Sequence, residues 1–131
     1  MKRETLLKKT IPELKKIAWT HFSKYIRNRD GYCFTCGSRN GIQAGHLFHN
    51  KGNTYFNEKN VHSQCSRCNL YLSGNLGEYT YRFIKKYGEK EYLKLKRQSN
   101  IPKKWKKNEL IDIIEKYKEL NNEKCRAKNV Y

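Results

Sequence analysis

The residues of this sequence best suited to metal binding and catalysis are its five cysteines and four histidines. Four cysteines form two pairs, Cys33-Phe-Thr-Cys36 and Cys65-Ser-Arg-Cys68, each with two residues between the thiols. A pair with this spacing can bind one metal ion through both thiolates, and two pairs complete the tetrahedral shell that Zn²⁺ favours. We therefore predict a structural zinc site. Cys125 stands alone near the C terminus and is expected to be an unligated thiol.

A zinc ion held by four cysteines has no open coordination position, so any catalysis must occur beside it. Three of the four histidines, His46, His49 and His62, fall between the two cysteine pairs. A neutral imidazole near pH 7 is suited to act as a general base. The alternative is that these histidines only form hydrogen bonds within a small zinc module.

The N-terminal elements are predicted to be a basic arm and a helix within residues 1–30. Thr10 can cap this helix, and Glu13 three residues later completes a capping box. The helix is expected to end near residues 30–31. Its apolar face is formed by residues at three- and four-residue steps, which are Leu14, Ile17, Ala18, Phe22, Tyr25 and Ile26.

Residues 31–77 change to short pieces rich in Gly and Asn, which indicates loops and a hairpin that need a metal for stability. Helical periodicity returns from about residue 76 with a stop at Gly88, and Pro102 breaks a second helical piece. A last helix is predicted from about Lys107. The expected fold is a mostly helical α+β protein, a single domain over residues 1–131, with its zinc centre between an N-terminal helix and basic C-terminal helices over 78–131.

The charge balance predicts a nucleic-acid partner. Among 131 residues, 29 Lys and Arg face 12 Asp and Glu, which gives a formal charge of +17. No apolar run approaches the roughly 20 residues of a membrane span, and no secretory signal is evident, so a cytoplasmic location is expected. The candidate DNA-binding residues are mostly basic, with one tryptophan that could stack on bases: Arg82, Lys85, Lys86, Lys94, Lys96, Arg97, Lys103, Lys104, Trp105, Lys106 and Lys107.

Two motifs carry a resemblance to a known family. The tripeptide Ala44-Gly45-His46 follows the first cysteine pair, and the string FNEKNVHSQCSRCNLYLSGN occupies residues 56–75. Together they resemble the NinG/Rap family of phage recombination nucleases, which belong to the His-Asn-His (HNH) group with a zinc-stabilised, treble-clef-like ββα-metal fold. The order of the motifs is more distantly similar to that of phage endonuclease VII.

The resemblance implies a one-metal phosphodiesterase. His46 would be the general base, and a divalent ion, Mg²⁺ or Mn²⁺, would stabilise the phosphate and the leaving oxygen. Asn60 would brace the loop that carries the base, and Asn69 would be a ligand of the catalytic ion. In the endonuclease VII register the base would instead be His49.

The sequence departs from the wider HNH group at one position, because the residue before the base is often Asp and here is Gly45. Mg²⁺ prefers carboxylate oxygen, and Glu58 is the only acidic residue between residues 31 and 77. Glu58 and His62 are therefore candidate ligands of the catalytic ion, with Gln43 and Asn57 as further candidates.

The resulting hypothesis is a metal-dependent endonuclease that cuts branched recombination intermediates such as Holliday junctions and D-loops. Symmetric cleavage of a junction needs two active sites, so a homodimer is expected. Two alternatives remain open from the sequence. One is a non-catalytic, zinc-stabilised module that binds DNA or RNA, and the other is a general HNH nickase acting on ordinary duplex DNA.

Overall fold

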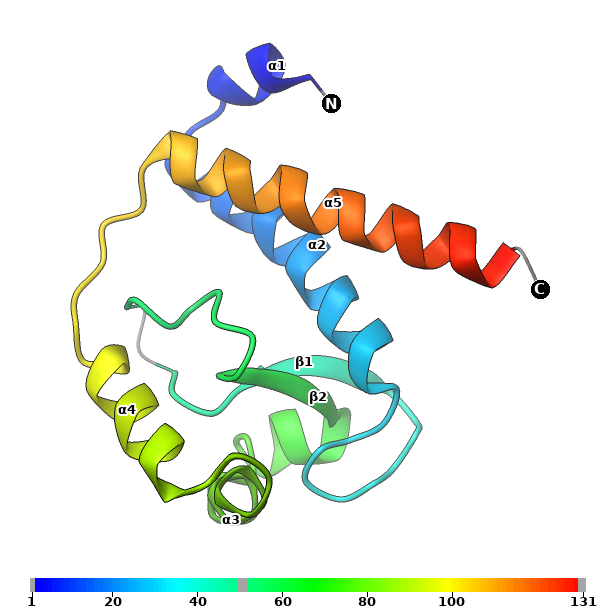
Figure 1. The fold of residues 1–131 in the computed structure, drawn as a ribbon, viewed down its shortest axis with the longest axis vertical. Coiled ribbons are helices and arrows are strands. Elements are labelled where there is room, and N and C mark those ends of the chain that lie inside the picture. The colour runs from blue at the N-terminus through cyan, green and yellow to red at the C-terminus, as the bar shows by residue number, and fades with distance from the viewer. Residues whose placement is uncertain (1, 50–51, 130–131) are drawn as a thin grey trace. The chain divides into compact units, whose positions relative to one another are not determined.

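The computed structural model describes residues 2–49 and 52–129, with side chains up to residue 123 in the last helix. The chain divides into two compact units, which are considered separately. One unit combines Met1–Tyr25 with Lys104–Tyr131, and the other is Ile26–Lys103. Figure 1 gives the order of the elements along the chain. The architecture is mostly helical α+β with a small two-stranded sheet, as predicted.

The first unit is helical. It contains α1 (Arg3–Leu7), most of α2 (Ile11–Asp30) and α5 (Lys107–Asn129). The predicted cap is present, because the Glu13 backbone N–H donates to Thr10 Oγ1 at 3.3 Å. The sequence predicted only a basic arm before α2, whereas the structure forms α1.

The core of this unit comes from the apolar stripes of its helices, because residues three and four apart share a helix face. Phe22 and Tyr117 meet edge to face with 4.9 Å between ring centroids. The fully or almost fully buried apolar residues of the unit are Leu6, Leu14, Ala18, Phe22, Leu110, Ile111, Ile114 and Tyr117.

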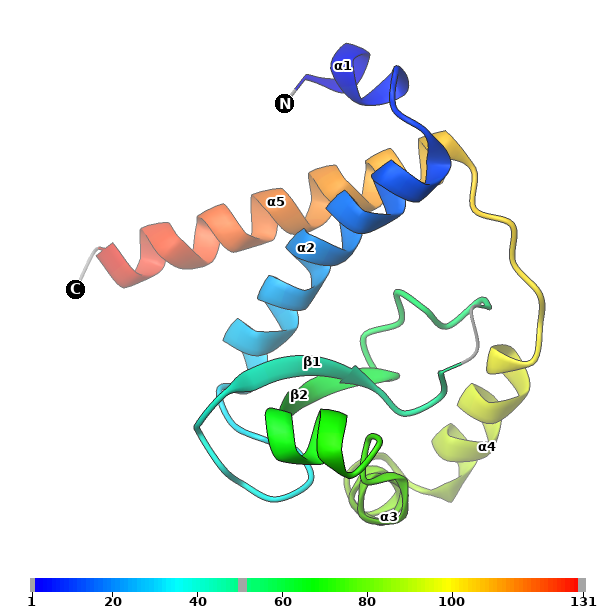
Figure 2. The same cartoon turned by 180° about the vertical axis from the view of Figure 1, so that it is seen from behind.

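The second unit is built on an antiparallel hairpin of β1 (Ile42–His46) and β2 (Val61–Cys65). Gly45 lies opposite His62 in the register. A single π-helical turn, η1 (Arg67–Tyr71), follows β2 and contacts both strands (Figure 2). Residues alternate between the two faces of a strand, so the odd positions of β1 and the even positions of β2 share one face.

The C-terminal end of α2 fixes the start of β2. Asp30 Oδ2 accepts a hydrogen bond from the Ser63 backbone N–H at 2.8 Å. The Arg29 guanidinium donates to the backbone carbonyl oxygens of Glu58 at 2.8 Å and Val61 at 2.9 Å. Arg29 and Asp30 also form an ion pair at 2.7 Å. The loop before β2 and the strand itself are thus held by charged side chains of the helix.

The helices α3 (Leu76–Tyr87) and α4 (Glu89–Ser99) complete this unit. They are separated at Gly88, where a φ of 93° ends α3 as the sequence predicted. α4 ends before Pro102, in agreement with the predicted break. The buried cluster between these helices and the preceding loops consists of Phe34, Leu47, Tyr79, Phe83 and Leu95.

Candidate functional site

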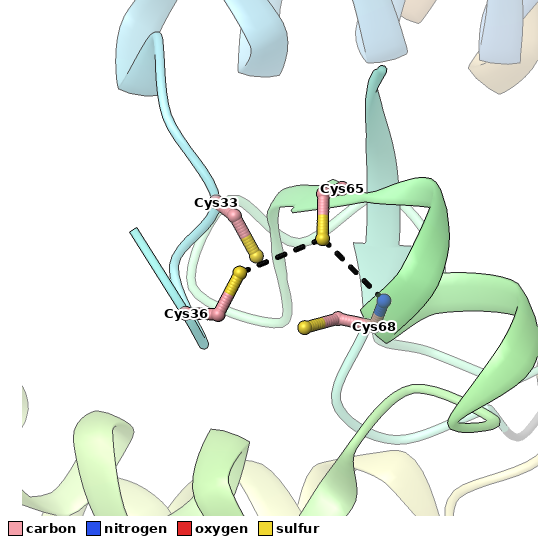
Figure 3. A group of neighbouring side chains, drawn as sticks. All are labelled: Cys33, Cys36, Cys65 and Cys68. Atoms are coloured by element: carbon pink, nitrogen blue, oxygen red, sulfur yellow. Dashed lines mark hydrogen bonds between the residues drawn. The ribbon is translucent and has the colours of Figure 1, made fainter. Parts of the chain in front are cut away.

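The two cysteine pairs converge, as their spacing predicted. The Sγ atoms of Cys33, Cys36, Cys65 and Cys68 all lie within 4.8 Å of one another. Figure 3 shows the four thiols directed toward a common centre. Cys36 is exposed, whereas the other three are buried. Four thiols in this arrangement can hold one tetrahedral metal ion such as Zn²⁺. The side chain of Cys125 lies outside the described residues.

Tight backbone turns shape this cluster. The Gly37 N–H donates to the Cys33 carbonyl at 2.8 Å, and the Cys68 N–H approaches Cys65 Sγ at 3.5 Å. Although burial raises the pKa of Cys33, hydrogen bonds from Thr35 and from backbone N–H groups lower it to about 6. The Ser38 backbone lowers the pKa of Cys36, but burial and the adjacent thiols raise it to about 12. The pKa of Cys33 is thus lowered and that of Cys36 raised, and a bound cation would replace the thiol protons.

His46 ends β1 and is half-buried beside Tyr55. Its Nε2 lies 3.0 Å from the Tyr55 carbonyl oxygen, and the two rings are 4.7 Å apart. A carbonyl can only accept, so Nε2 carries the proton of the neutral imidazole and Nδ1 carries the lone pair. This tautomer presents Nδ1 as the basic nitrogen.

Asn60 braces the loop that follows His46. Its Oδ1 accepts from the Phe48 N–H at 2.8 Å, and its Nδ2 donates to the carbonyl oxygens of Phe48 and Thr54, each at 3.0 Å. Asn60 is completely buried. Its side chain therefore connects the segment between β1 and β2 to the residue just before β2.

Asn69 lies on η1, and its side chain faces β1. Its Nδ2 donates to Gln43 Oε1 at 2.8 Å, which turns its Oδ1 toward Gly45. A Cβ built on Gly45 would lie 2.8 Å from this Oδ1 and 2.0 Å from Gln64 Oε1. Because both oxygens lie this close to one point, they are at most 4.8 Å apart. Two amide oxygens thus converge beside Gly45.

Gln64 is a residue of this site that the sequence reasoning missed. It is completely buried, and its Nε2 donates to the Gly74 carbonyl at 2.7 Å. Its buried Oε1 has no hydrogen-bond partner among the residues that the structure describes. A signal was available, because a glycine inside a strand often marks a close approach, and strand alternation puts Gln64 on the face of Gly45. Gly45 itself is buried within β1.

His49 lies near His46 and near Gly74. Its ring centroid is 6.2 Å from that of His46, and its Nε2 is 3.3 Å from the position that a Cβ on Gly74 would occupy. Gly74 is the residue whose carbonyl accepts from Gln64. The structure therefore places both candidate bases beside the hairpin, and the two remain alternatives.

His62 lies opposite Gly45 on the same face of the hairpin, but its imidazole contacts aromatic side chains of the preceding loop and of α3. Its Nδ1 is 3.1 Å from the Tyr79 hydroxyl, its Nε2 is 2.9 Å from the Tyr87 hydroxyl, and its ring stacks on Phe34 at 4.1 Å. Burial, reinforced by the charge of Arg29, lowers the pKa of His62 to about 3. The structure assigns both ring nitrogens to tyrosine hydroxyls rather than to a ligand set with Asn69.

Glu58, the other candidate ligand, is found in the loop before β2. Its backbone carbonyl accepts from Arg29, and the negative charge of its side chain contributes to the raised pKa of that guanidinium. Within the described residues, the only group of three or more His, Cys, Asp or Glu arranged to hold a metal is the cysteine cluster. Neither Glu58 nor His62 belongs to such a group among those residues.

The candidate DNA-binding residues occupy α3, α4 and the segment before and at the start of α5. Arg82 is paired with Glu78 one turn earlier at 2.8 Å, and both side chains remain partly exposed. Lys85, Lys94 and Lys96 are exposed on their helices, and Trp105 is half-buried.

A family model described as the bacteriophage lambda NinG protein matches residues 1–127. The chain belongs to the NinG family. The ninG protein of Escherichia phage 933W is 32% identical over 109 residues, which cover 77% of this chain and 54% of that protein. The ninG protein of Escherichia phage lambda is 39% identical over 67 residues, which cover 48% of this chain and 33% of that protein.

These matches confirm the family to which the motifs pointed. This NinG-family chain spans about half the length of the phage 933W relative that it matches. No solved structure matches it. Among the described residues, no helix is long and apolar enough to cross a membrane.

Proposed function

We propose that this NinG-family protein is a metal-dependent endonuclease of the HNH type. The antiparallel hairpin β1–β2 followed by the helical turn η1 supports the proposal, because a ββα-metal centre is also built from two strands and a helical segment. The observation that carries the proposal is the hydrogen bond from His46 Nε2 to the Tyr55 carbonyl, because it sets the tautomer in which Nδ1 is the basic nitrogen, as a general base requires.

The catalytic ion of HNH enzymes requires oxygen ligands, and the residues present fit it. Asn69 Oδ1 and Gln64 Oε1 converge beside Gly45, and Gln64 Oε1 is a buried acceptor without a hydrogen-bond partner among the described residues. Amide oxygens are suitable ligands for hard cations. Asn69 and Gln64 would hold Mg²⁺ or Mn²⁺, which when bound would offset the negative charge on the scissile phosphate and the leaving oxygen.

The protein's own residues supply the remaining functions. His46 Nδ1 would take a proton from the attacking water, and Tyr55 would keep the imidazole oriented through its carbonyl. Asn60 would maintain the position of the loop after β1. The cysteine cluster would stabilise the site with a structural zinc, because Cys65 ends β2 and Cys68 lies in η1.

The proposed substrate is branched DNA, such as a Holliday junction or a D-loop. The formal charge of +17 and the exposed lysines of α3 and α4 support binding to the phosphate backbone. Preference for branches rests on the resemblance to NinG/Rap nucleases. We further propose that the protein acts as a homodimer in the cytoplasm of an infected host, because symmetric cleavage of a junction requires two sites.

The test compares a labelled four-way junction with a linear duplex of the same sequence. Zinc-loaded protein is assayed with Mg²⁺, with Mn²⁺ and without an added divalent ion. We expect cleavage of the junction only with the divalent ion, and a loss of at least about 100-fold in His46→Ala, typical of removing a general base. Binding of the junction by His46→Ala should match that of wild type.

His49→Ala is the matched comparison. It should retain more activity than His46→Ala if His46 is the base, and the reverse order would transfer the role to His49. His21→Ala, on α2 in the other unit, controls for loss of an unrelated imidazole. Tight binding with no product under every metal condition would reject the enzyme in favour of a zinc-stabilised binding module. Equal cleavage of junction and duplex would indicate a general nickase.

A further inference from the structure

A cavity beside the cysteine cluster is not used by the proposed chemistry. It lies within the unit Ile26–Lys103 and has a volume of about 270 Å³. Its walls are Tyr32 and Phe34, from the loop that carries the first cysteine pair, and Arg82, Lys85 and Lys86, from α3. Two aromatic rings and three cations therefore line one space that is open to solvent.

The aromatic residues have different roles in this cavity. Phe34 is 8% exposed and stacks on His62, so it forms a fixed floor. Tyr32 is 46% exposed and can offer its ring to a ligand. An exposed aromatic ring beside cations is the combination that binds unstacked bases of single-stranded nucleic acid, since every base has a π-face.

The cations are arranged to meet an anion. Lys85 and Lys86 are exposed, and none of the described side chains that line the cavity is acidic. Lys86 Nζ lies 5.8 Å from the centroid of the Phe34 ring and 5.2 Å from that of Tyr87, so its ammonium group stays close to the aromatic wall. The charge of Arg82 is partly engaged by Glu78, which leaves the two lysines as the principal phosphate donors.

We propose that this cavity binds one unstacked nucleotide of a DNA strand, with its base against Tyr32 and its phosphate between Lys85 and Lys86. The volume is close to the lower end of the roughly 300–1,000 Å³ range of ligand pockets, which suits a single nucleotide rather than a longer segment. A continuous duplex keeps its bases stacked, whereas a branch point offers unpaired ones. The cavity would thus distinguish branched DNA from duplex. This inference rests on the proposed function only in taking DNA as the nucleic acid that binds.

The test measures binding rather than cleavage. Zinc-loaded protein without Mg²⁺ is titrated against a forked DNA that carries 2-aminopurine at the unpaired position next to the branch, and against a matched duplex. Tyr32→Ala is compared with Tyr81→Ala, because Tyr81 is 61% exposed on α3 but does not line the cavity. Lys85→Gln is compared with Lys90→Gln on α4, which is also exposed and outside the cavity.

Tyr32→Ala should bind the fork roughly tenfold more weakly, which is the scale of one lost base–aromatic stack, and should lose the change in 2-aminopurine emission. Its affinity for duplex should stay within about twofold, and Tyr81→Ala should resemble wild type. Lys85→Gln should weaken fork binding more than duplex binding, whereas Lys90→Gln should affect both DNAs equally.

The inference is overturned if Tyr32→Ala and Tyr81→Ala bind the fork alike, or if Tyr32→Ala weakens fork and duplex binding equally. Its failure is separable from that of the proposed function. A protein that binds the fork through Tyr32 but never cleaves DNA would retain this inference and lose the nuclease. A protein that cleaves junctions while Tyr32→Ala binds as wild type would retain the nuclease alone.

Discussion

At the scale of single residues, the histidines of the hairpin show how neighbouring groups decide the role of an imidazole. His46 is oriented by one backbone carbonyl and stays at the end of its strand. His62, in the facing strand, is completely buried and shares both ring nitrogens with tyrosine hydroxyls. The same side chain is therefore a candidate base at one position and a neutral core residue at the other.

The depressed pKa of His62 predicts a specific pH dependence of stability. Its pKa is lowered from 6.5 in the unfolded chain to about 3 in the fold, so only the unfolded state binds a proton between these values. The stabilisation is complete above pH 6.5 and is lost as the pH falls toward 3. Between pH 7 and pH 5 the free energy of unfolding should fall by about 2 kcal/mol more in wild type than in His62→Gln.

Urea unfolding of zinc-loaded wild type and of His62→Gln at pH 7, 6 and 5 measures this difference. Protonation of the cysteine thiolates affects both proteins equally, so it cancels in the comparison. Parallel pH profiles for the two proteins would show that His62 does not titrate differently on folding.

At the scale of elements, the site depends on the contact of η1 with the hairpin. Gly45 in β1 provides the room in which Asn69 and Gln64 meet. Gly74, in the backbone after η1, links η1 to β2. Its N–H donates to the Cys68 carbonyl at 2.8 Å, and its carbonyl accepts from Gln64. Gly74 has a φ of 93°, a conformation that favours glycine. The element contacts thus connect the cysteine cluster with the proposed metal ligands.

Gly45→Ala tests this arrangement directly. The added Cβ would displace the ends of Gln64 and Asn69, which are flexible but buried or half-buried and hydrogen-bonded. We expect a loss of about 1–3 kcal/mol in stability from disturbed hydrogen bonds. We also expect at least a tenfold weaker Mn²⁺ affinity, measured by electron paramagnetic resonance of the free ion.

Gly77→Ala is the matched control, since a Cβ at Gly77 in α3 would meet nothing within 4 Å. It should leave Mn²⁺ binding unchanged and keep or slightly raise stability, because alanine favours helices. If Gly45→Ala binds Mn²⁺ as tightly as Gly77→Ala does, Gln64 and Asn69 are not ligands of one ion.

At the scale of the whole molecule, the two units have different sources of stability. The unit of Met1–Tyr25 and Lys104–Tyr131 contains an apolar helical core. The unit Ile26–Lys103 has a small aromatic core and long loops, with the cysteine cluster joining the first loop to the end of the hairpin. A formal charge of +17 also disfavours a compact chain unless anions neutralise it.

Zinc removal should therefore act on the unit Ile26–Lys103. We expect one zinc ion per chain, and we expect Cys65→Ser or a strong chelator to abolish amide protection in β1, β2 and η1. Metal analysis and hydrogen exchange measure the two effects. Cys125→Ser is the control, since Cys125 is far from both cysteine pairs in the sequence. This variant should still bind one zinc ion per chain. Unchanged protection of the hairpin after complete zinc loss would show that the cluster does not support the fold.

The sequence by itself determined those features that depend on local spacing. The paired cysteines predicted the cluster, the three- and four-residue steps predicted the face of α2, and Gly88 and Pro102 marked helix limits. These signals are local because thiol spacing, helical periodicity and backbone restrictions act over a few residues. The motif string also pointed to the family, which the family match confirmed.

Only the tertiary structure decided which side chains meet across the chain. The partners of His62, the orientation of His46 by Tyr55 and the convergence of Gln64 with Asn69 all join residues distant in sequence. So does the cavity between Tyr32 and Lys85. Such contacts depend on strand register and helix packing, which no local pattern specifies, and burial then sets the pKa and hydrogen bonding of each group. Composition and spacing thus indicated the cysteine cluster and the helices, whereas packing established the environment of each candidate functional group.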